Sequence, residues 1–201
     1  MVIIARSKFF PKRSYTFRIF FRDFNRAIQN LGSIRETMRS GTISHKFAEH
    51  VMLAVTAVNG CRYCSWVHAR MALEAGCTTK EIAGILTSDS GAIASDEAIA
   101  IAFAHHYADS CGNPERFALL RLVKAYGLQK SRDILNSIYL ITIGNYMGNT
   151  LDAFRSRLHG IPPSRGSLLF EFLVFVIGTP LVKGFGLAHV IGTLDTHVRH
   201  G

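Results

Sequence analysis

The sequence predicts an all-α helical bundle that assembles into an oligomer and carries an extra helical segment at its C-terminus. Apolar residues recur every three or four positions along most of the 201 residues, as on the buried face of a helix. No segment alternates apolar and polar residues as a half-buried strand does. Hydrophobic residues make up 48% of the chain and charged residues only 18%, a ratio that favours contacts between subunits or with a membrane.

The N-terminal part of the chain is strongly basic. Residues 1–46 hold ten Lys and Arg against two acidic residues, and so carry +8 of the net charge of +9. We interpret residues 1–16, which Pro11 interrupts, as a basic tail. Residues 17–39 have helical spacing with arginines on a separate face, which predicts one helix that packs its phenylalanines on the core. The alternative is a basic amphipathic helix on an anionic membrane surface. No nucleic-acid-binding motif accompanies the charge, so we expect no nucleic-acid partner.

Capping residues and glycines divide the centre of the chain into further helices. Ser44 and Ser95 are expected helix caps, Gly76 ends a helix, and Thr78 with Glu81 reads as a capping box. A bend is expected in the last long helix, near one of its glycines, Gly144 or Gly148. We interpret the isolated Cys77 and Cys111 as small buried residues. The predicted helices span about residues 45–58, 61–75, 79–86, 95–109, 114–126 and 130–158.

Residues 161–201 form an apolar C-terminal extension beyond the main domain, which we place at residues 17–160. The extension contains two apolar stretches, residues 167–177 and 181–194, divided by Pro180. Neither stretch reaches the roughly 20 residues that a membrane span needs. We therefore predict an added helical segment that packs on the core or on a neighbouring subunit, with a membrane-lying hairpin as the alternative.

The residues with the clearest chemistry are a Cys-x2-Cys pair, Cys61 and Cys64, with His68 four positions after the second cysteine. In a helix that begins near Cys61, the three side chains lie at i, i+3 and i+7 and share one face. Unsatisfied N–H groups and the macrodipole at a helix N-terminus favour an anionic sulfur. Glu49 lies twelve residues before Cys61. This pattern predicts a dithiol/disulfide redox centre with an acid–base partner.

The spacing Glu-x11-Cys-x2-Cys-x3-His, within the phrase NGCRYCSWVHARMALEAGCTTKEIAGIL, resembles the AhpD-like alkylhydroperoxidases of the carboxymuconolactone decarboxylase superfamily. The resemblance covers about residues 17–160 and implies an all-α fold, trimers or multiples of trimers, and thiol-dependent peroxide reduction. It also implies that Cys64 is the peroxidatic sulfur and Cys61 the resolving one, whereas helix-terminus electrostatics alone would favour Cys61. The chain departs from the better-studied peroxidases in carrying Tyr63 where they carry histidine.

In this interpretation a thiolate attacks the peroxide, becomes a sulfenic acid, and condenses with the second thiol to a disulfide. Glu49 and His68 would transfer the protons. Asn145 and Asn149 are candidates for bordering the pocket, because the corresponding helix of the family lies near the active site. The expected partners are a hydroperoxide and a thiol or disulfide reductant, with no cofactor and no resident metal.

Three other functional classes stay open on the sequence alone. The chain could be a general dithiol–disulfide oxidoreductase, a zinc protein that uses Glu49, Cys61, Cys64 and His68 as ligands, or a membrane-associated structural protein of the same fold. Carboxymuconolactone decarboxylation does not require a cysteine pair, so the pair argues against that reaction. Four cysteines without a secretory signal favour a reducing compartment, and we expect a cytoplasmic location.

Overall fold

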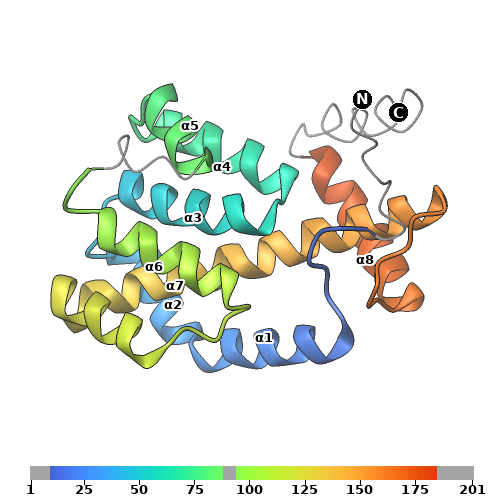
Figure 1. Cartoon of the computed structure of the whole chain (residues 1–201), viewed down its shortest axis with the longest axis horizontal. Helices are drawn as coiled ribbons and strands as arrows, with labels where there is room; N and C mark the ends of the chain where they lie inside the picture. The colour runs from blue at the N-terminus through green and yellow to red at the C-terminus, as the bar shows by residue number, and fades with distance from the viewer. Residues whose placement is uncertain (1–9, 88–93, 185–201) are drawn as a thin grey trace, which may run out of the picture. The chain divides into compact units, whose positions relative to one another are not determined.

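The computed structural model describes residues 10–87 and 94–184 of the chain (Figure 1). Within these ranges the secondary structure is helical, and the only pairing of extended backbone is a single bridge between Phe10 and Pro163. The predicted all-α fold is therefore confirmed for the described part of the chain. The helices are α1 (Phe17–Gln29), α2 (Leu31–Ser40), α3 (His45–Asn59), α4 (Arg62–Glu74), α5 (Thr79–Thr87), α6 (Ala98–Asp109), α7 (Arg116–Leu158) and α8 (Leu168–Gly184).

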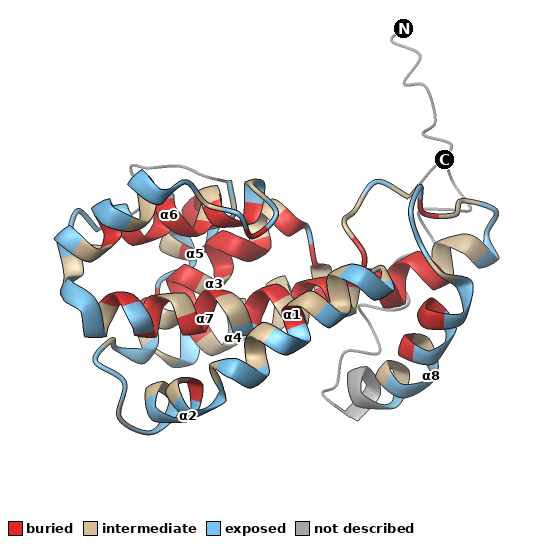
Figure 2. Ribbon diagram, turned by 90° about the horizontal axis from the view of Figure 1, so that it is seen from below, coloured by how far each residue is buried: buried red, intermediate tan, exposed pale blue. Residues whose placement is uncertain are grey.

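The chain divides into two compact units. The central unit is Arg22–Asn145, and the terminal unit combines Met1–Phe21 with Tyr146–Gly201. Helix α3 lies at the heart of the central unit and packs against α4, α5 and α6 (Figure 1). Figure 2 shows α3 as largely buried. The side chains of this core that are almost fully buried include Val51, Leu53, Val55, Ile85, Ile101, Leu122, Ile134 and Ile138.

Local capping signals place the ends of the central helices where the sequence predicts them. The Ser44 hydroxyl accepts a hydrogen bond from the Phe47 N–H at 3.1 Å and begins α3. Thr78 and Glu81 form the expected reciprocal capping box, at 2.6 and 3.2 Å. A hydrogen bond from Lys46 is the main cause that lowers the pKa of Glu81 to about 2. Together these contacts fix the start of the two helices that flank the cysteine-bearing α4.

The single helix predicted over residues 17–39 is wrong, because the chain turns at Asn30 and forms two helices. The Asn30 side chain donates to the Arg26 carbonyl at 2.7 Å, a local bond of the kind that competes with continued helix. The predicted burial of the phenylalanine stripe is also wrong. Phe21 and Phe24 of α1 are 55% and 47% exposed, and Asp23 is the buried residue of this helix.

One further expectation about the helices needs correction, and another is confirmed. Helix α6 begins at Ala98, after a turn that includes Ser95, so Ser95 is not its cap. The division expected between helices over 114–126 and 130–158 is confirmed, because α7 consists of two helices that meet at a kink at the non-helical Gly127 (φ 74°, ψ 172°). The expected bend near Gly144 or Gly148 stays a prediction. Glycine adopts a positive φ without the steric strain that a Cβ causes, which explains why the break falls at Gly127.

The other two corrections concern single residues. Cys111 is exposed, with φ 56°, and is not the small core residue that its isolation suggested, whereas Cys77 is buried as expected. Helix α8 continues through Pro180, where the sequence predicted a division. None of the helices in the described ranges combines the length and the hydrophobicity that crossing a bilayer requires.

In the terminal unit, the backbone before α1 packs closely although it forms no helix. Tyr15 is fully buried, with its ring centroid 5.1 Å from that of Tyr146 and 6.3 Å from that of Phe170. Glu171, also fully buried, accepts two hydrogen bonds from the Arg157 guanidinium at 2.8 and 3.0 Å. The extension thus adds buried helical surface at Phe170, Glu171 and Val174. The domain boundaries at 1–16, 17–160 and 161–201 stay predictions.

Candidate functional site

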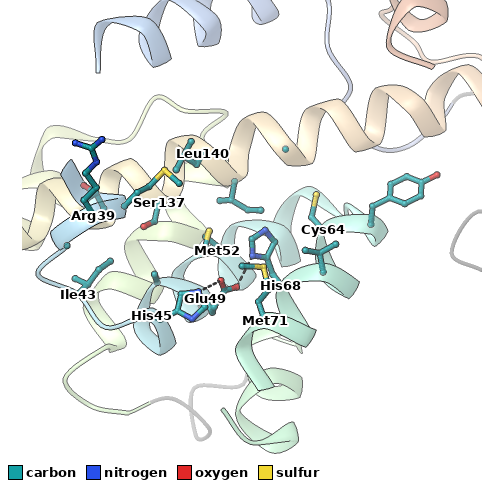
Figure 3. Close-up of a pocket in the computed structure, with 18 residues that line it drawn as sticks. Arg39, Ile43, His45, Glu49, Met52, Cys64, His68, Met71, Ser137 and Leu140 are labelled. Atoms are coloured by element: carbon teal, nitrogen blue, oxygen red, sulfur yellow. Dashed lines mark hydrogen bonds and ion pairs between the residues drawn. The ribbon is translucent and has the colours of Figure 1, made fainter. Parts of the chain in front are cut away.

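A cavity of about 730 Å³ in the central unit brings the predicted chemistry together with an apolar lining (Figure 3). Its walls come from α2, α3, α4, the first part of α7 that belongs to this unit, and the segment between α2 and α3. Glu49, Cys64 and His68 all line it. The methionine and aliphatic side chains of its wall are Met38, Ile43, Ala48, Met52, Val67, Met71, Leu140 and Ile141.

The two cysteines lie at the start of α4, and both are thiols. Cys61 is the N-cap residue, and its Sγ accepts a hydrogen bond from the Cys64 N–H at 3.3 Å. Cys61 is fully buried, whereas Cys64 is half-buried and lines the cavity. A Cβ built at Gly144 of α7 would lie 4.0 Å from the Cys64 Sγ. The lack of a side chain at Gly144 therefore leaves space beside this sulfur.

Glu49 and His68 form the expected carboxylate–imidazole pair. Glu49 is fully buried on α3, and its Oε2 lies 2.8 Å from Nδ1 of His68 on α4. His68 lies one helical turn after Cys64, and both side chains line the same cavity. When Nδ1–H donates to the carboxylate, the Nε2 of His68 keeps a lone pair that can accept a proton. The arrangement can therefore take a proton at the cavity and stabilise the imidazolium that results.

His45 is a further member of the site that the sequence analysis missed. Its Nε2 lies 3.4 Å from Oε1 of Glu49, the second oxygen of the same carboxylate (Figure 3). His45 also lines the cavity, and its side chain is 61% exposed, so the buried Glu49 lies between the His68 imidazole and one in contact with solvent. The signal was present in the sequence, because residues at i and i+4 of a helix are neighbours.

Three further residues, Tyr63, Asn145 and Asn149, were singled out in the sequence, and each has a hydrogen bond that defines its position. Tyr63 lines the cavity, and its hydroxyl accepts a hydrogen bond from Arg62 at 2.8 Å. Asn145 is fully buried, donates to the Thr56 hydroxyl at 3.2 Å and does not line the cavity. Asn149 belongs to the terminal unit and donates to the backbone of that unit. The expectation that the two asparagines border the pocket is therefore wrong.

Metal coordination receives no support from the arrangement of these side chains. Across residues 10–87 and 94–184, no group of three or more His, Cys, Asp or Glu side chains converges in a way that could hold a metal ion. Glu49 instead lies against two imidazoles, and Cys61 accepts from the backbone. The four candidate zinc ligands are thus arranged as hydrogen-bonded pairs.

Residues 23–104 match the family model of the carboxymuconolactone decarboxylase family. This segment belongs to that family. The match includes Glu49, Cys61, Cys64 and His68 and confirms the superfamily inferred from their spacing. The carboxymuconolactone decarboxylase family includes alkylhydroperoxidases as well as decarboxylases. No curated protein and no solved structure matches the chain.

Proposed function

We propose that this protein is a thiol-dependent peroxidase in which Cys64 is oxidised first and Cys61 resolves the product. The observation that carries the proposal is the position of the Cys64 thiol in an apolar cavity, one helical turn from an imidazole that is bonded to a buried carboxylate. Accessibility also supports this order, because Cys61 is fully buried and Cys64 is not.

The chemical steps follow from these positions. His68 accepts the Cys64 thiol proton, and the thiolate attacks one oxygen of the hydroperoxide. An S–O bond forms, the O–O bond breaks, and the leaving alkoxide receives a proton from the imidazolium, which gives an alcohol and a sulfenic acid. The Cys61 thiol then attacks the sulfenic sulfur, an S–S bond forms and water leaves. An external dithiol reduces the disulfide and is itself oxidised.

Glu49 supports both proton transfers. Its carboxylate orients His68 and offsets the positive charge that develops on the imidazole. The exposed His45, on the other carboxylate oxygen, supplies a route by which the buried pair exchanges protons with solvent. This route does not need an imidazole at position 63, where the chain carries tyrosine.

The lining of the cavity favours a hydroperoxide with an apolar organic group. Three methionines and five aliphatic side chains line this space, so an alkyl or aryl group would leave water on binding. Hydrogen peroxide has no apolar group that could be buried against these side chains. We therefore expect an organic hydroperoxide such as cumene hydroperoxide to be consumed with a higher kcat/KM than hydrogen peroxide.

Trapping of the sulfenic acid tests the assignment of the two sulfurs. Cys61→Ser protein treated with cumene hydroperoxide should carry a dimedone-type adduct at Cys64, because the resolving thiol has been removed. Cys64→Ser protein should leave Cys61 largely unlabelled, and Cys111→Ser serves as a matched control that keeps the pair intact. Peptide mapping reads the result. An adduct on Cys61 in Cys64→Ser protein, without one on Cys64 in the converse variant, would reverse the assignment.

A general dithiol–disulfide oxidoreductase is the second candidate, and Tyr63 is the observation that favours it. Position 63 carries a tyrosine, whose hydroxyl accepts a hydrogen bond from Arg62, and therefore offers no imidazole next to Cys64 in the sequence. Such an enzyme would exchange the Cys61–Cys64 disulfide with a small disulfide substrate, yet consume peroxide no faster than a free thiol. Parallel assays with a hydroperoxide and with a low-molecular-weight disulfide separate the two functions.

A further inference from the structure

A second hydrogen-bonded chain of thiol, imidazole and carboxylate lies in the central unit, apart from the cavity. The Nε2 of His50 lies 3.2 Å from the Cys77 Sγ, and its Nδ1 lies 2.5 Å from Oε2 of Glu97. His50 belongs to α3, Cys77 precedes α5, and Glu97 precedes α6. The three residues are 27 and 47 positions apart, so only the tertiary fold assembles them. None of the three lines the cavity that contains Cys64.

The order of the three groups is the one that activates a nucleophile. Glu97 holds the Nδ1–H of His50, which leaves the lone pair of Nε2 directed at the sulfur. A base bonded to a nucleophile and oriented by a third group is the general arrangement of covalent catalysis. His50 and Cys77 are 4% and 6% exposed, so water competes little for these contacts.

We propose that Cys77 is a second reactive thiol, activated by His50 and Glu97, that a small peroxide oxidises to a sulfenic acid. His50 takes the thiol proton, the sulfur attacks one oxygen of hydrogen peroxide, and an S–O bond forms as the O–O bond breaks. The leaving hydroxide takes the proton from the imidazolium and departs as water. The small exposed fraction of Cys77 limits the oxidant to a molecule about the size of hydrogen peroxide.

The charges around Cys77 explain why a base is needed there. Burial is the largest effect and raises the pKa of the Cys77 thiol, Lys46 lowers it, and the three carboxylates Glu49, Glu81 and Glu97 raise it. The resting group is therefore a neutral thiol, which is the state that donates to Nε2. If the cluster served only packing, such a thiol would be inert near neutral pH. A packing role therefore predicts an unreactive Cys77 thiol, whereas the proposed role predicts a Cys77 thiol that hydrogen peroxide oxidises.

The test uses full-length Cys61→Ser/Cys64→Ser/Cys111→Ser protein, in which Cys77 is the remaining thiol of the four. Treatment with hydrogen peroxide and a dimedone-type probe at pH 7 should give an adduct at Cys77. A further His50→Gln substitution should slow its formation about 10²–10⁴-fold, the usual loss on removing a general base. Glu97→Gln, which keeps the shape of the side chain, should slow it about 10-fold or more through the orientation of His50.

The matched control carries Cys61→Ser/Cys64→Ser/Cys77→Ser and keeps the exposed Cys111, whose rate His50→Gln should leave unchanged. The pH profile gives a second measurement: an unassisted thiol loses about tenfold in rate per pH unit below its pKa, and the Cys77 rate should fall less steeply. The proposal is refuted by no adduct at Cys77 in folded protein, or by equal rates with and without His50. Because both cysteines of the peroxidase pair are absent, neither outcome depends on the proposed peroxidase function.

Discussion

Replacing Glu49 with glutamine should reduce catalysis strongly and leave stability nearly unchanged. Glutamine keeps the shape of the side chain and an oxygen that can accept from the His68 Nδ1–H, 2.8 Å away. It removes the negative charge that stabilises the imidazolium during proton transfer. Loss of one proton-transfer partner costs about 10²–10⁴-fold in rate, which corresponds to about 2.7–5.4 kcal/mol of barrier. We expect the rate of Cys64 oxidation to fall by this factor.

The effect on stability has a different origin and should be small. Glu49 is fully buried, and a buried ionised carboxylate loses much of its hydration on folding. A neutral side chain of equal volume avoids that cost while it gives up the attraction to the imidazoles. We therefore expect the free energy of unfolding to stay within about 1 kcal/mol of its original value.

Two measurements on the same proteins separate these effects. Stopped-flow oxidation in the Cys61→Ser background gives the rate at Cys64, and urea denaturation gives the free energy of unfolding. The matched control is Glu74→Gln on α4, whose carboxylate is 63% exposed and bonded to Arg70, and which should change neither quantity appreciably. An oxidation rate within threefold of the original would remove Glu49 from the proton path. A slow variant that is also several kcal/mol less stable would show a structural role instead.

Three other predictions concern the cavity, the stability contributed by a buried carboxylate, and the assembly. Gly144→Ala should stabilise α7 by about 0.5–1 kcal/mol. Its new methyl group, 4.0 Å from the Cys64 Sγ, should slow cumene hydroperoxide more than hydrogen peroxide in steady-state assays. Asp133→Ala should lower the free energy of unfolding by about 3 kcal/mol at pH 7, because Thr37 and Thr42 lose an acceptor at 2.6–2.7 Å. Burial raises the pKa of Asp133, but these hydrogen bonds lower it overall. The part of the destabilisation that depends on the charge of Asp133 should therefore be lost in urea titrations as the pH falls below about 4 and through the lowered pKa. Sedimentation should show an oligomer at micromolar concentration, and a folded monomer would contradict the expectation drawn from the apolar composition.

Most structural features set by a few neighbouring residues were predicted correctly, although Ser95 does not cap α6. Ser44 caps α3, Thr78 and Glu81 form their capping box, and Cys61 begins the cysteine helix, because each depends on backbone groups within one turn. The buried face of α3 was also predictable, since Val51 and Val55 follow the helical period. These features carry enough information to place the Cys-x2-Cys pair at a helix N-terminus.

Features that depend on distant parts of the chain were not predictable in this way. The helical period of residues 17–39 continues across Asn30, and nothing in that period shows whether a second element covers the apolar face. Phe21 and Phe24 therefore fit a core pattern and are nevertheless about half exposed in the single chain. Exposed aromatic residues of this kind are usual at interfaces between subunits, so we expect them to lie at a subunit contact if the protein forms the predicted oligomer.

The contacts of the candidate site also divide into those set by neighbouring residues and those set by distant parts of the chain. Glu49 and His68 were identified through their spacing within a family pattern, whereas His45 needed only the i, i+4 relation on α3 and was overlooked. The contact between His50 and Glu97 spans 47 positions, and no spacing rule indicates it. The packing of α3 against α6 brings His50 and Glu97 together.

Helix α3 carries the proposed acid–base residues of both proposed thiol centres, Glu49 and His50, and both side chains are buried. Glu49 and His50 are consecutive, so they project about 100° apart around the helix axis and reach different partners. Glu49 contacts the His68 imidazole beside Cys64, and His50 contacts the sulfur of Cys77. A buried charged or polar side chain destabilises a fold unless it is hydrogen-bonded. Glu49 and His50 each have such a bond, to His68 and to Cys77 with Glu97, and the two proposals assign proton transfer to both.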